Sequence, residues 1–313
     1  MTNTVERWVL GPQRPEQNLA GAFGSRDFPA GPVAVISAGW QEAEGDLDHV
    51  SRLVAQPLVD LGLYQRAEQL MEQDPALREA YRERQDRLIE LQRLHRRRMR
   101  QLSAAARELL SAEGNTSLLA PERRHAISQL RSLDTHHLNR VESIHREFHE
   151  QLRARDHELL ASHVQQVRSI MDRCSSVLIT GGNVVILINR LLLFGIGKEI
   201  EARPLVAWSA GAMALASRIV LFHDNTPHGR RSPEVMGAGL GILPGYIFLP
   251  DAQRRLRTND PLRTGLLGKR FSPDTCVLLN NGAMIRFHGA NPREAHNVQR
   301  IDRRGKLKSL RVE

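Results

Sequence analysis

The sequence predicts an α/β domain with a mostly parallel sheet, interrupted by a long antiparallel pair of helices. Two observations support the sheet: short apolar runs, and the turns that follow them. Short apolar runs lie within residues 32–40, 177–181 and 204–208, and each is followed by a glycine or small-residue turn. Unbroken runs of this kind are typical of strands that are buried on both faces of a parallel sheet. The third observation is the helical spacing of apolar residues throughout residues 66–173.

Residues 1–31 are rich in Gly, Pro and polar side chains, and we expect them to pack loosely across the edge of the sheet. The strand within residues 32–40 ends in a glycine turn, and a helix is predicted over residues 48–61. The loop between them would border the ligand crevice of an open α/β sheet. Glu42 and Glu44 are therefore either substrate contacts or solvated loop carboxylates.

Apolar positions three and four residues apart predict two long helices, over residues 66–112 and 121–173. Arg84, His95 and Arg98 interrupt the apolar spacing of the first helix. Each helix would be roughly 65–75 Å long, which is more than one small sheet can cover. We therefore expect this hairpin to project from the domain, or to pair with the hairpin of a second chain in a homodimer.

The run that begins at Val177 is apolar enough to raise the question of a membrane-spanning helix. However, Gly181-Gly182-Asn183 interrupts it, and Arg190 would lie deep in lipid at a cost of several kcal/mol. The sequence predicts a strand, a glycine turn and a helix here, and no membrane span.

Ser209 falls at the end of the apolar run 204–208, and the small residues Ala210, Gly211 and Ala212 open a helix directly after it. A serine on a sharp turn between strand and helix is held out at the carboxyl end of the sheet, as in a nucleophile elbow. The small neighbours let the backbone turn without a clash. These residues leave two interpretations open: an activated serine, or an inert serine in a tight β-to-α turn.

Three motifs occur in a characteristic order: GGN at residues 181–183, WSAGA at 208–212 and GLGILP at 239–244. This ordered set resembles the dipeptidase E and cyanophycinase family of serine peptidases, within the class I glutamine amidotransferase-like superfamily. The resemblance covers residues 32–63 and 177–287. It implies a flavodoxin-like α/β sandwich.

The resemblance also implies roles for individual residues. Ser209 would be the nucleophile, and backbone N–H groups around Gly182 and Ala210 would form the oxyanion hole, with Gly181 and Asn183 beside it. A glycine turn before a helix presents unpaired donors to developing negative charge, so the assignment is physically sound.

The family's catalytic histidine has no counterpart in its usual place, which Asp251 occupies. Aspartate has an ordinary pKa of about 3.9, against about 6.5 for histidine, and is a poorer general base near neutrality. Loss of one triad member typically leaves only about 10³- to 10⁴-fold catalysis over water. His223 or His228 could replace the histidine, and Asp224 and Glu234 are the nearest candidates for the acid.

A short arginine-rich helix follows Asp251. Arg254 and its neighbours Arg255 and Arg257 either clamp a substrate carboxylate, which matches the aspartyl substrates that the resemblance implies, or form a solvated surface. Further on, residues 277–285 are predicted to form a β-hairpin, and a last strand is expected near residues 298–301.

The chain of 313 residues has a formal charge of +9 and a pI near 10.4. This balance favours anionic partners without choosing among acidic peptides, nucleic acid and a membrane surface. Residues 93–100 form the densest basic block and are either a phosphate-binding surface or a solvated helix face. Cys174 and Cys276 lie in apolar segments and should be buried, reduced thiols. With no targeting segment at the start of the sequence, we expect a cytoplasmic protein.

His145 and His149 are four residues apart and could share a helix face, which is spacing compatible with a metal ion. No cysteine or carboxylate completes such a site, so we predict no metal and no cofactor.

The predicted organisation is a first part of the α/β domain at residues 1–65, an inserted hairpin at 66–173, and a second part with the elbow at 174–313. Two functions remain open. One is a serine hydrolase of small, aspartyl-type peptides that uses Ser209. The other is a catalytically silent relative that binds an acidic ligand or partner, with the basic hairpin serving dimerisation or nucleic-acid or protein binding. A glutamine amidotransferase reaction is disfavoured, because those enzymes carry cysteine at the elbow.

Overall fold

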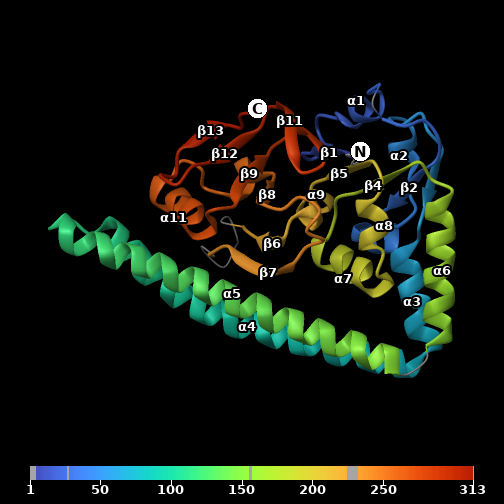
Figure 1. Ribbon diagram of the computed structural model, residues 1–313, viewed down its shortest axis with the longest axis horizontal. Coiled ribbons are helices and arrows are strands. Elements are labelled where there is room, and N and C mark those ends of the chain that lie inside the picture. Colours follow the sequence, from blue (N-terminus) through green and yellow to red (C-terminus); the bar gives the residue numbers. More distant parts are fainter. Residues whose placement is uncertain (1–4, 27, 155–156, 224–231, 313) are drawn as a thin grey trace.

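The computed structural model describes residues 5–26, 28–154, 157–223 and 232–312 (Figure 1). The strands are β1 (Glu6–Leu10), β2 (Val33–Ile36), β3 (Leu58–Asp60), β4 (Ser176–Ile179), β5 (Leu205–Trp208), β6 (Arg218–Leu221), β7 (Glu234–Ala238), β8 (Tyr246–Pro250), β9 (Thr275–Leu279), β10 (Met284–His288), β11 (Asn291–His296), β12 (Gln299–Ile301) and β13 (Leu307–Ser309). The helices are α1 (Leu19–Phe23), the 3-10 helix η1 (Ala38–Ala43), α2 (Asp48–Ser51), α3 (Leu63–Gln73), α4 (Pro75–Ser111), α5 (Thr116–Ala154), α6 (Glu158–Asp172), α7 (Val184–Phe194), α8 (Gly197–Glu201), α9 (Ala210–Leu215), α10 (Ala252–Arg255) and α11 (Pro261–Phe271).

The main sheet has seven strands in the order β11-β10-β1-β5-β4-β2-β3. The five strands from β1 to β3 are parallel to one another, and β10 and β11 extend the sheet as an antiparallel ribbon. Counted along the chain from β2, the strands lie in the order second, first, third, fourth, which is the flavodoxin-like arrangement. The predicted α/β fold class with a mostly parallel sheet is confirmed, as are the strands expected near residues 32–40, 177–181 and 204–208.

Alternate residues of the parallel strands face two different apolar layers, because successive strand side chains point to opposite faces. In β4, Val177 and Ile179 pack in the large cluster that includes side chains of α3, α6, α7 and α9. Leu178 packs on the other face, with side chains of α1 and α2. Both faces are thus covered, which explains why the strands have unbroken apolar sequences.

The N-terminal segment differs from the prediction. Instead of crossing the sheet edge, β1 lies inside the sheet, parallel to β5 and antiparallel to β10. Trp8, Val9 and Leu10 are all buried. This strand occupies the place of the fifth strand in the flavodoxin-like order, and it therefore brings Leu10 next to Trp208 and the turn that follows it.

Two other local predictions are wrong. The helix expected over residues 48–61 ends at Ser51, and β3 follows it; Pro57, which lacks an N–H donor, directly precedes this strand. The hairpin expected over residues 277–285 is not one, because its two strands join different sheets. β9 belongs to a four-stranded sheet of order β13-β12-β9-β8, whereas β10 belongs to the main sheet. The last predicted strand, near residues 298–301, is present as β12.

The two predicted long helices are each divided in two. The first breaks at Asp74, whose side chain caps α4 by accepting from Leu77 N at 2.8 Å, with Pro75 as the first residue of the helix. The second is interrupted at His157, the non-helical N-cap of α6. His157 Nδ1 lies 2.6 Å from Asp74 Oδ2, so the two breaks are at the same level and both helices change direction together.

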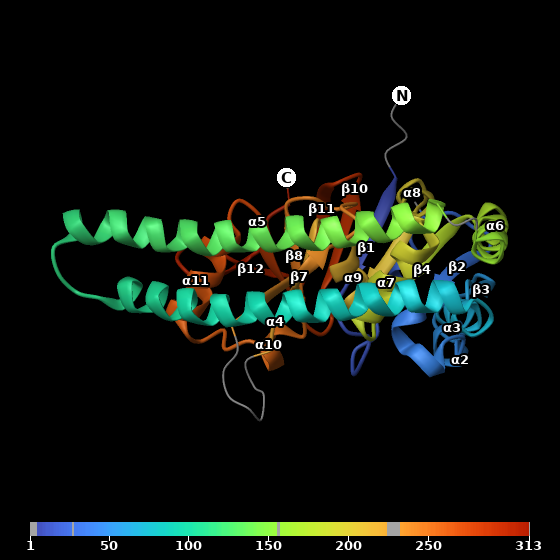
Figure 2. The ribbon, with the colours of Figure 1, turned by 90° about the horizontal axis from the view of Figure 1, so that it is seen from below.

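The hairpin of α4 and α5 lies along the α/β body and does not project freely, which overturns the first of our two expectations for it (Figures 1 and 2). It crosses below β7 and α11, and its closed end reaches beyond α11 in Figure 1. Arg131 of α5 donates to the carbonyl oxygens of Lys269 and Arg270, and Arg270 binds Asp134 through two hydrogen bonds of 2.6 Å. The hairpin is therefore anchored by buried polar contacts as well as by apolar packing.

Arg84 and His95 were expected to interrupt the apolar stripe of the hairpin, but they lie within it. Their exposed fractions are 2% and 3%. The Arg84 guanidinium is stacked between the rings of Tyr81 and Phe148, 4.3 Å from each centroid. The surface along which α4 and α5 pack together thus contains polar side chains as well as apolar ones.

Within the described residues, no helix combines the length and the apolar character that crossing a membrane requires. Cys174 and Cys276 are both buried and unpaired, as predicted.

Candidate active site

Ser209 lies at the turn between β5 and α9, in a backbone conformation that side chains rarely adopt. Its φ is 49° and its ψ is −111°. Two hydrogen bonds hold it: Ser209 N donates to Leu10 O at 3.2 Å, and Met213 N donates to Ser209 O at 3.1 Å. A residue stays in so unfavourable a region only when its surroundings impose it, and such residues cluster at functional sites. This is the geometry of a nucleophile elbow.

The small residues around the elbow are required by close backbone packing. A Cβ on Gly211 would lie 2.4 Å from Ile179 O, and a Cβ on Gly181 would lie 3.2 Å from Ser209 Cβ. Gly182 has a φ of 105°, and its Cβ would lie 2.3 Å from Gly39 O. The loops after β2, β4 and β5 are therefore pressed together at the carboxyl edge of the sheet.

Backbone donors are available on both sides of Ser209. Ala210 is the first residue of α9, so its N–H has no partner within the helix. Gly182 lines the same pocket as Ala210 and Ser209. The Asn183 side chain caps α7, because its Oδ1 accepts a hydrogen bond from Val185 N at 3.0 Å. Its side chain therefore stabilises the N-terminus of this helix.

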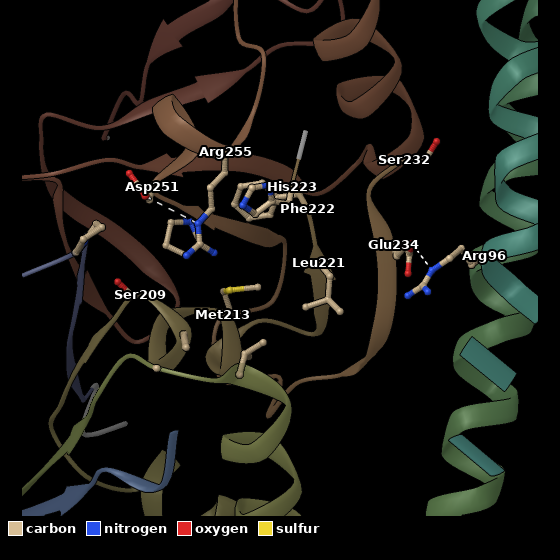
Figure 3. Close-up of a pocket in the computed structure, with 15 residues that line it drawn as sticks. Arg96, Ser209, Met213, Leu221, Phe222, His223, Ser232, Glu234, Asp251 and Arg255 are labelled. Carbon is tan, nitrogen blue, oxygen red and sulfur yellow. Dashed lines mark hydrogen bonds and ion pairs between the residues drawn. The ribbon is translucent and has the colours of Figure 1, made fainter. Parts of the chain in front are cut away.

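The pocket in front of Ser209 has a volume of about 490 Å³ (Figure 3). Its charged and polar lining includes Ser209, His223, Asp251, Arg255, Glu234 and Arg96. Asp251 and Arg255 lie on one side of the pocket in Figure 3, and the ion pair of Glu234 and Arg96 lies on the other. Positive and negative side chains thus alternate around a space that is large enough for a small molecule.

Asp251 lies at the end of β8 in a left-handed conformation, with φ 54° and ψ 35°. Its Oδ2 is 3.9 Å from both Arg254 NH1 and Arg255 Nε. The Arg254 side chain is 84% exposed and does not line the pocket, whereas Arg255 does. The carboxylate is thus directed towards arginines, and Arg255 rather than Arg254 shares the lining of the pocket with Ser209.

His223 lines the pocket with an exposed side chain, and no hydrogen bond joins it to Ser209. In the part of the chain that the structure describes, Ser209 Oγ makes no hydrogen bond to any side chain. Asp224 and His228 lie outside the described residues. Glu234 is 6% exposed, and its carboxylate accepts from Arg96 and Gln92 rather than from a histidine.

A second, smaller pocket of about 350 Å³ lies on the other side of Ser209. Trp40, His49 and Trp208 contribute to its lining, and the Trp40 and His49 rings are 5.2 Å apart between centroids. His49 is a histidine near the elbow that sequence reasoning missed. In the sequence, the only indication was that His49 belongs to the helix predicted over residues 48–61. That position does not show which way the imidazole ring points.

Glu42 and Glu44 line neither pocket. Glu44 accepts from the backbone N–H groups of Tyr64 and Gln65 and so caps α3, while Glu42 accepts from the Tyr64 hydroxyl. Burial raises the pKa of Glu44 to about 6. Among the described residues, no three His, Cys, Asp or Glu side chains come together in a way that could hold a metal ion, and the pair His145 and His149 acquires no further ligand.

No protein-family model and no curated protein matches the chain. Two solved structures are similar to it over nearly their whole length. One is a peptidase from an acI-B1 actinobacterium, with a TM-score of 0.44 and 10% identity over 98% of this chain and 97% of that chain. The other, from Listeria monocytogenes EGD-e, bears the name of a peptidase E protein and has a TM-score of 0.41 and 10% identity over 96% of this chain and 100% of that chain. Both scores are low, and neither likeness indicates what this chain does.

Proposed function

We propose that the chain is a serine hydrolase that cleaves small substrates carrying a carboxylate, with Ser209 as the nucleophile. The observation that carries the proposal is the Ser209 backbone at φ 49° and ψ −111°, which holds the hydroxyl at the mouth of the pocket. The N–H groups of Gly182 and Ala210 would stabilise the oxyanion. Arg255 would attract the substrate carboxylate.

In the proposed reaction, His223 takes the proton of Ser209 Oγ as this oxygen bonds to the substrate carbonyl carbon. The carbonyl oxygen becomes negatively charged and accepts hydrogen bonds from Gly182 and Ala210. When the intermediate collapses, the bond to the leaving amine breaks and the amine takes the proton from His223. A water molecule then hydrolyses the acyl ester on Ser209 by the same route. His223 has to approach the serine for this chemistry.

The test is covalent labelling with a fluorophosphonate probe, which reacts only with an activated serine. Wild type should label, Ser209→Ala should not, and His223→Gln should label at least about a hundredfold more slowly, the lower end of a general base's contribution. His49→Gln serves as the matched control, because His49 borders the smaller pocket on the other side of Ser209. An unlabelled wild type, or equal loss in the two histidine variants, would refute the assignment of His223 as base.

A second candidate, a catalytically silent binding protein, is favoured by one observation. The Asp251 carboxylate is directed towards Arg254 and Arg255. In the resemblance to the dipeptidase E family, this aspartate would take the place of the catalytic histidine. If only Asp251→His labels, the elbow and oxyanion donors are competent and the natural chain lacks a base. Binding of an acidic ligand would then be its function. Dimerisation through the hairpin and binding of nucleic acid stay predictions for either candidate.

A further inference from the structure

A groove with strongly positive lining runs between α4 and α11, next to the pocket of Ser209. Its volume is about 760 Å³. Six arginines line it: Arg93, Arg96, Arg97, Arg100, Arg107 and Arg263. Two carboxylates, those of Glu234 and Asp260, also line it, which leaves a surplus of four positive charges on the lining.

The arginines of α4 form a row because of their spacing. Arg93, Arg97, Arg100 and Arg107 follow one another at intervals of three, four or seven residues, which places them on one face of the helix. At 1.5 Å per residue the row is about 21 Å long. Arg82 and Arg98 belong to the same helix but do not line the groove. The arginines of the basic block at residues 93–100 are therefore divided: some line the groove, and Arg98 does not.

One arginine of the groove is nearly buried. Arg263 of α11 is only 7% exposed, and a smaller cavity that shares residues with the groove is bordered by Arg107, Arg263 and Arg270. The nearby carboxylates already have hydrogen-bond partners. Asp260 Oδ1 caps α11 by accepting from Arg263 N at 3.0 Å, and Glu234 accepts from Arg96. Arg263 thus adds a nearly buried guanidinium to the lining of the groove.

Arg97 and Arg100 make no hydrogen bond or ion pair within the described part of the chain. Both side chains are exposed on the groove. Their planar guanidinium groups are suited to bidentate contact with phosphate oxygens. The groove lining includes no aromatic side chain among the described residues, so nothing there offers a stacking surface for a nucleic-acid base. Its volume is in the range of small-molecule sites.

We propose that this groove binds a small compound that carries several phosphate groups. The arginine row and Arg263 would contact the phosphates, and the absence of stacking surfaces among the described lining residues favours a compact polyphosphate over a nucleic-acid strand. The site borders the Ser209 pocket, because Arg96, Ser232 and Glu234 line both. The proposal goes beyond the hydrolase function and does not depend on the reactivity of Ser209.

The experiment is calorimetric titration of the full chain with inorganic tripolyphosphate. Wild type should bind one tripolyphosphate per chain, more weakly at about 200 mM salt than at about 50 mM. Arg97→Gln/Arg100→Gln should weaken binding by about tenfold or more, since each charged hydrogen bond is worth about that factor. The matched control is Arg82→Gln/Arg98→Gln, with the same change of charge on the same helix and an unchanged affinity. Ser209→Ala should bind like wild type.

Four results would overturn the proposal. Tripolyphosphate fails to bind wild type, or the two double variants lose affinity equally, which would indicate general attraction to a basic protein. Alternatively, a single-stranded oligonucleotide binds and tripolyphosphate does not displace it, which would make the row a nucleic-acid surface. In the fourth case, hexa-aspartate displaces tripolyphosphate at lower concentration, and the groove then recognises acidic peptides. Circular dichroism of each variant confirms that the exposed substitutions leave the helices intact.

Discussion

Arg96 Nε donates to Glu234 Oε1 at 2.7 Å, and this contact joins the helical hairpin to the wall of the Ser209 pocket. Gln92 continues the connection, because its Nε2 donates to Glu234 Oε2 at 3.1 Å while its Oε1 is 2.9 Å from His137 Nε2. A side chain from each helix of the hairpin thus takes part in positioning Glu234. The hairpin is a component of the candidate site rather than an appendage to it.

Arg96→Gln should lower the free energy of unfolding by about 1 kcal/mol, because the nearly buried Glu234 would keep only Gln92 as a partner. Urea denaturation followed by circular dichroism measures the change. Arg93→Gln is the matched control: Arg93 pairs with Glu90, both side chains are more than half exposed, and the loss of this pair should change stability little. Equal effects of the two substitutions would contradict a structural role of the contact between hairpin and β7.

Asp134→Asn should be strongly destabilising, by about 3–5 kcal/mol, because Asp134 and Arg270 are 1% and 3% exposed and the arginine would lose its only carboxylate partner among the described residues. Chemical denaturation measures the loss. Asp172→Asn removes an exposed carboxylate that pairs with Arg203, and it should have little effect. A mild effect at Asp134 would mean that the hairpin is held mainly by its apolar contacts.

The same carboxylate predicts an acid dependence. Burial alone would raise the pKa of Asp134, but hydrogen bonding from His95 and the positive charge of Arg270 lower it below its ordinary 3.8. A carboxyl group with a lowered folded pKa stabilises the protein above its unfolded pKa, and this stabilisation is lost as the pH falls through the folded value. The difference between wild type and Asp134→Asn should therefore shrink below about pH 4.

His137 and His145 of α5 predict a second pH dependence, at milder acidity. Burial, together with the positive charge of His95 for His137 and of Arg84 for His145, lowers the pKa of each to about 4 from an ordinary 6.5. Between these values the unfolded chain binds protons that the folded chain does not, so stability falls as the pH drops from 6.5 to 4.

We expect His145→Leu to flatten this dependence in thermal denaturation curves recorded across that range. His125→Leu, at an exposed position of the same helix, should leave it unchanged. A steep loss of stability that persists in His145→Leu and also in His137→Leu would show that other groups cause it.

Ser209→Gly should be more stable than Ser209→Ala by about 1 kcal/mol, because glycine adopts a positive φ freely whereas any Cβ is strained there. Thermal denaturation of the two variants measures the difference. Ala202→Gly is the control at an ordinary backbone conformation, with φ −74°, where glycine should instead cost about 0.5–1 kcal/mol. If glycine is the less stable residue at position 209 as well, the elbow is not strained.

Several elements could be predicted because their signals are local. The strands β2, β4 and β5 have unbroken apolar sequences, and small residues follow Ser209 where the backbone has to turn sharply. These patterns were sufficient for the fold class and the elbow. In contrast, β1 could not be placed from the sequence, because three apolar residues in a polar segment do not indicate whether they join the centre or the edge of a sheet.

The hairpin illustrates a second limit. Its length and helical spacing were evident, but Arg84 and His95 were interpreted as breaks in the apolar stripe. Both are buried against partners that include residues of other elements. Phe148 of α5 and Tyr81 of the same helix enclose the Arg84 guanidinium, and His95 contacts Asp134 of α5, which Arg270 of α11 also holds. A polar side chain can be buried between two helices only where other residues contact it favourably. The spacing of residues along one helix does not show which residues of other segments will do so.

By itself, the sequence determined the class of the domain, the two long helices and the serine at the elbow, because each follows from the preferences of neighbouring residues. Only the tertiary structure decided what surrounds that serine. Arg96 and Glu234 are 138 positions apart, and Arg255 rather than Arg254 borders the pocket because of the way a short helix leaves its strand. Contacts of this kind depend on how whole elements pack, since charge and burial act through space rather than along the chain.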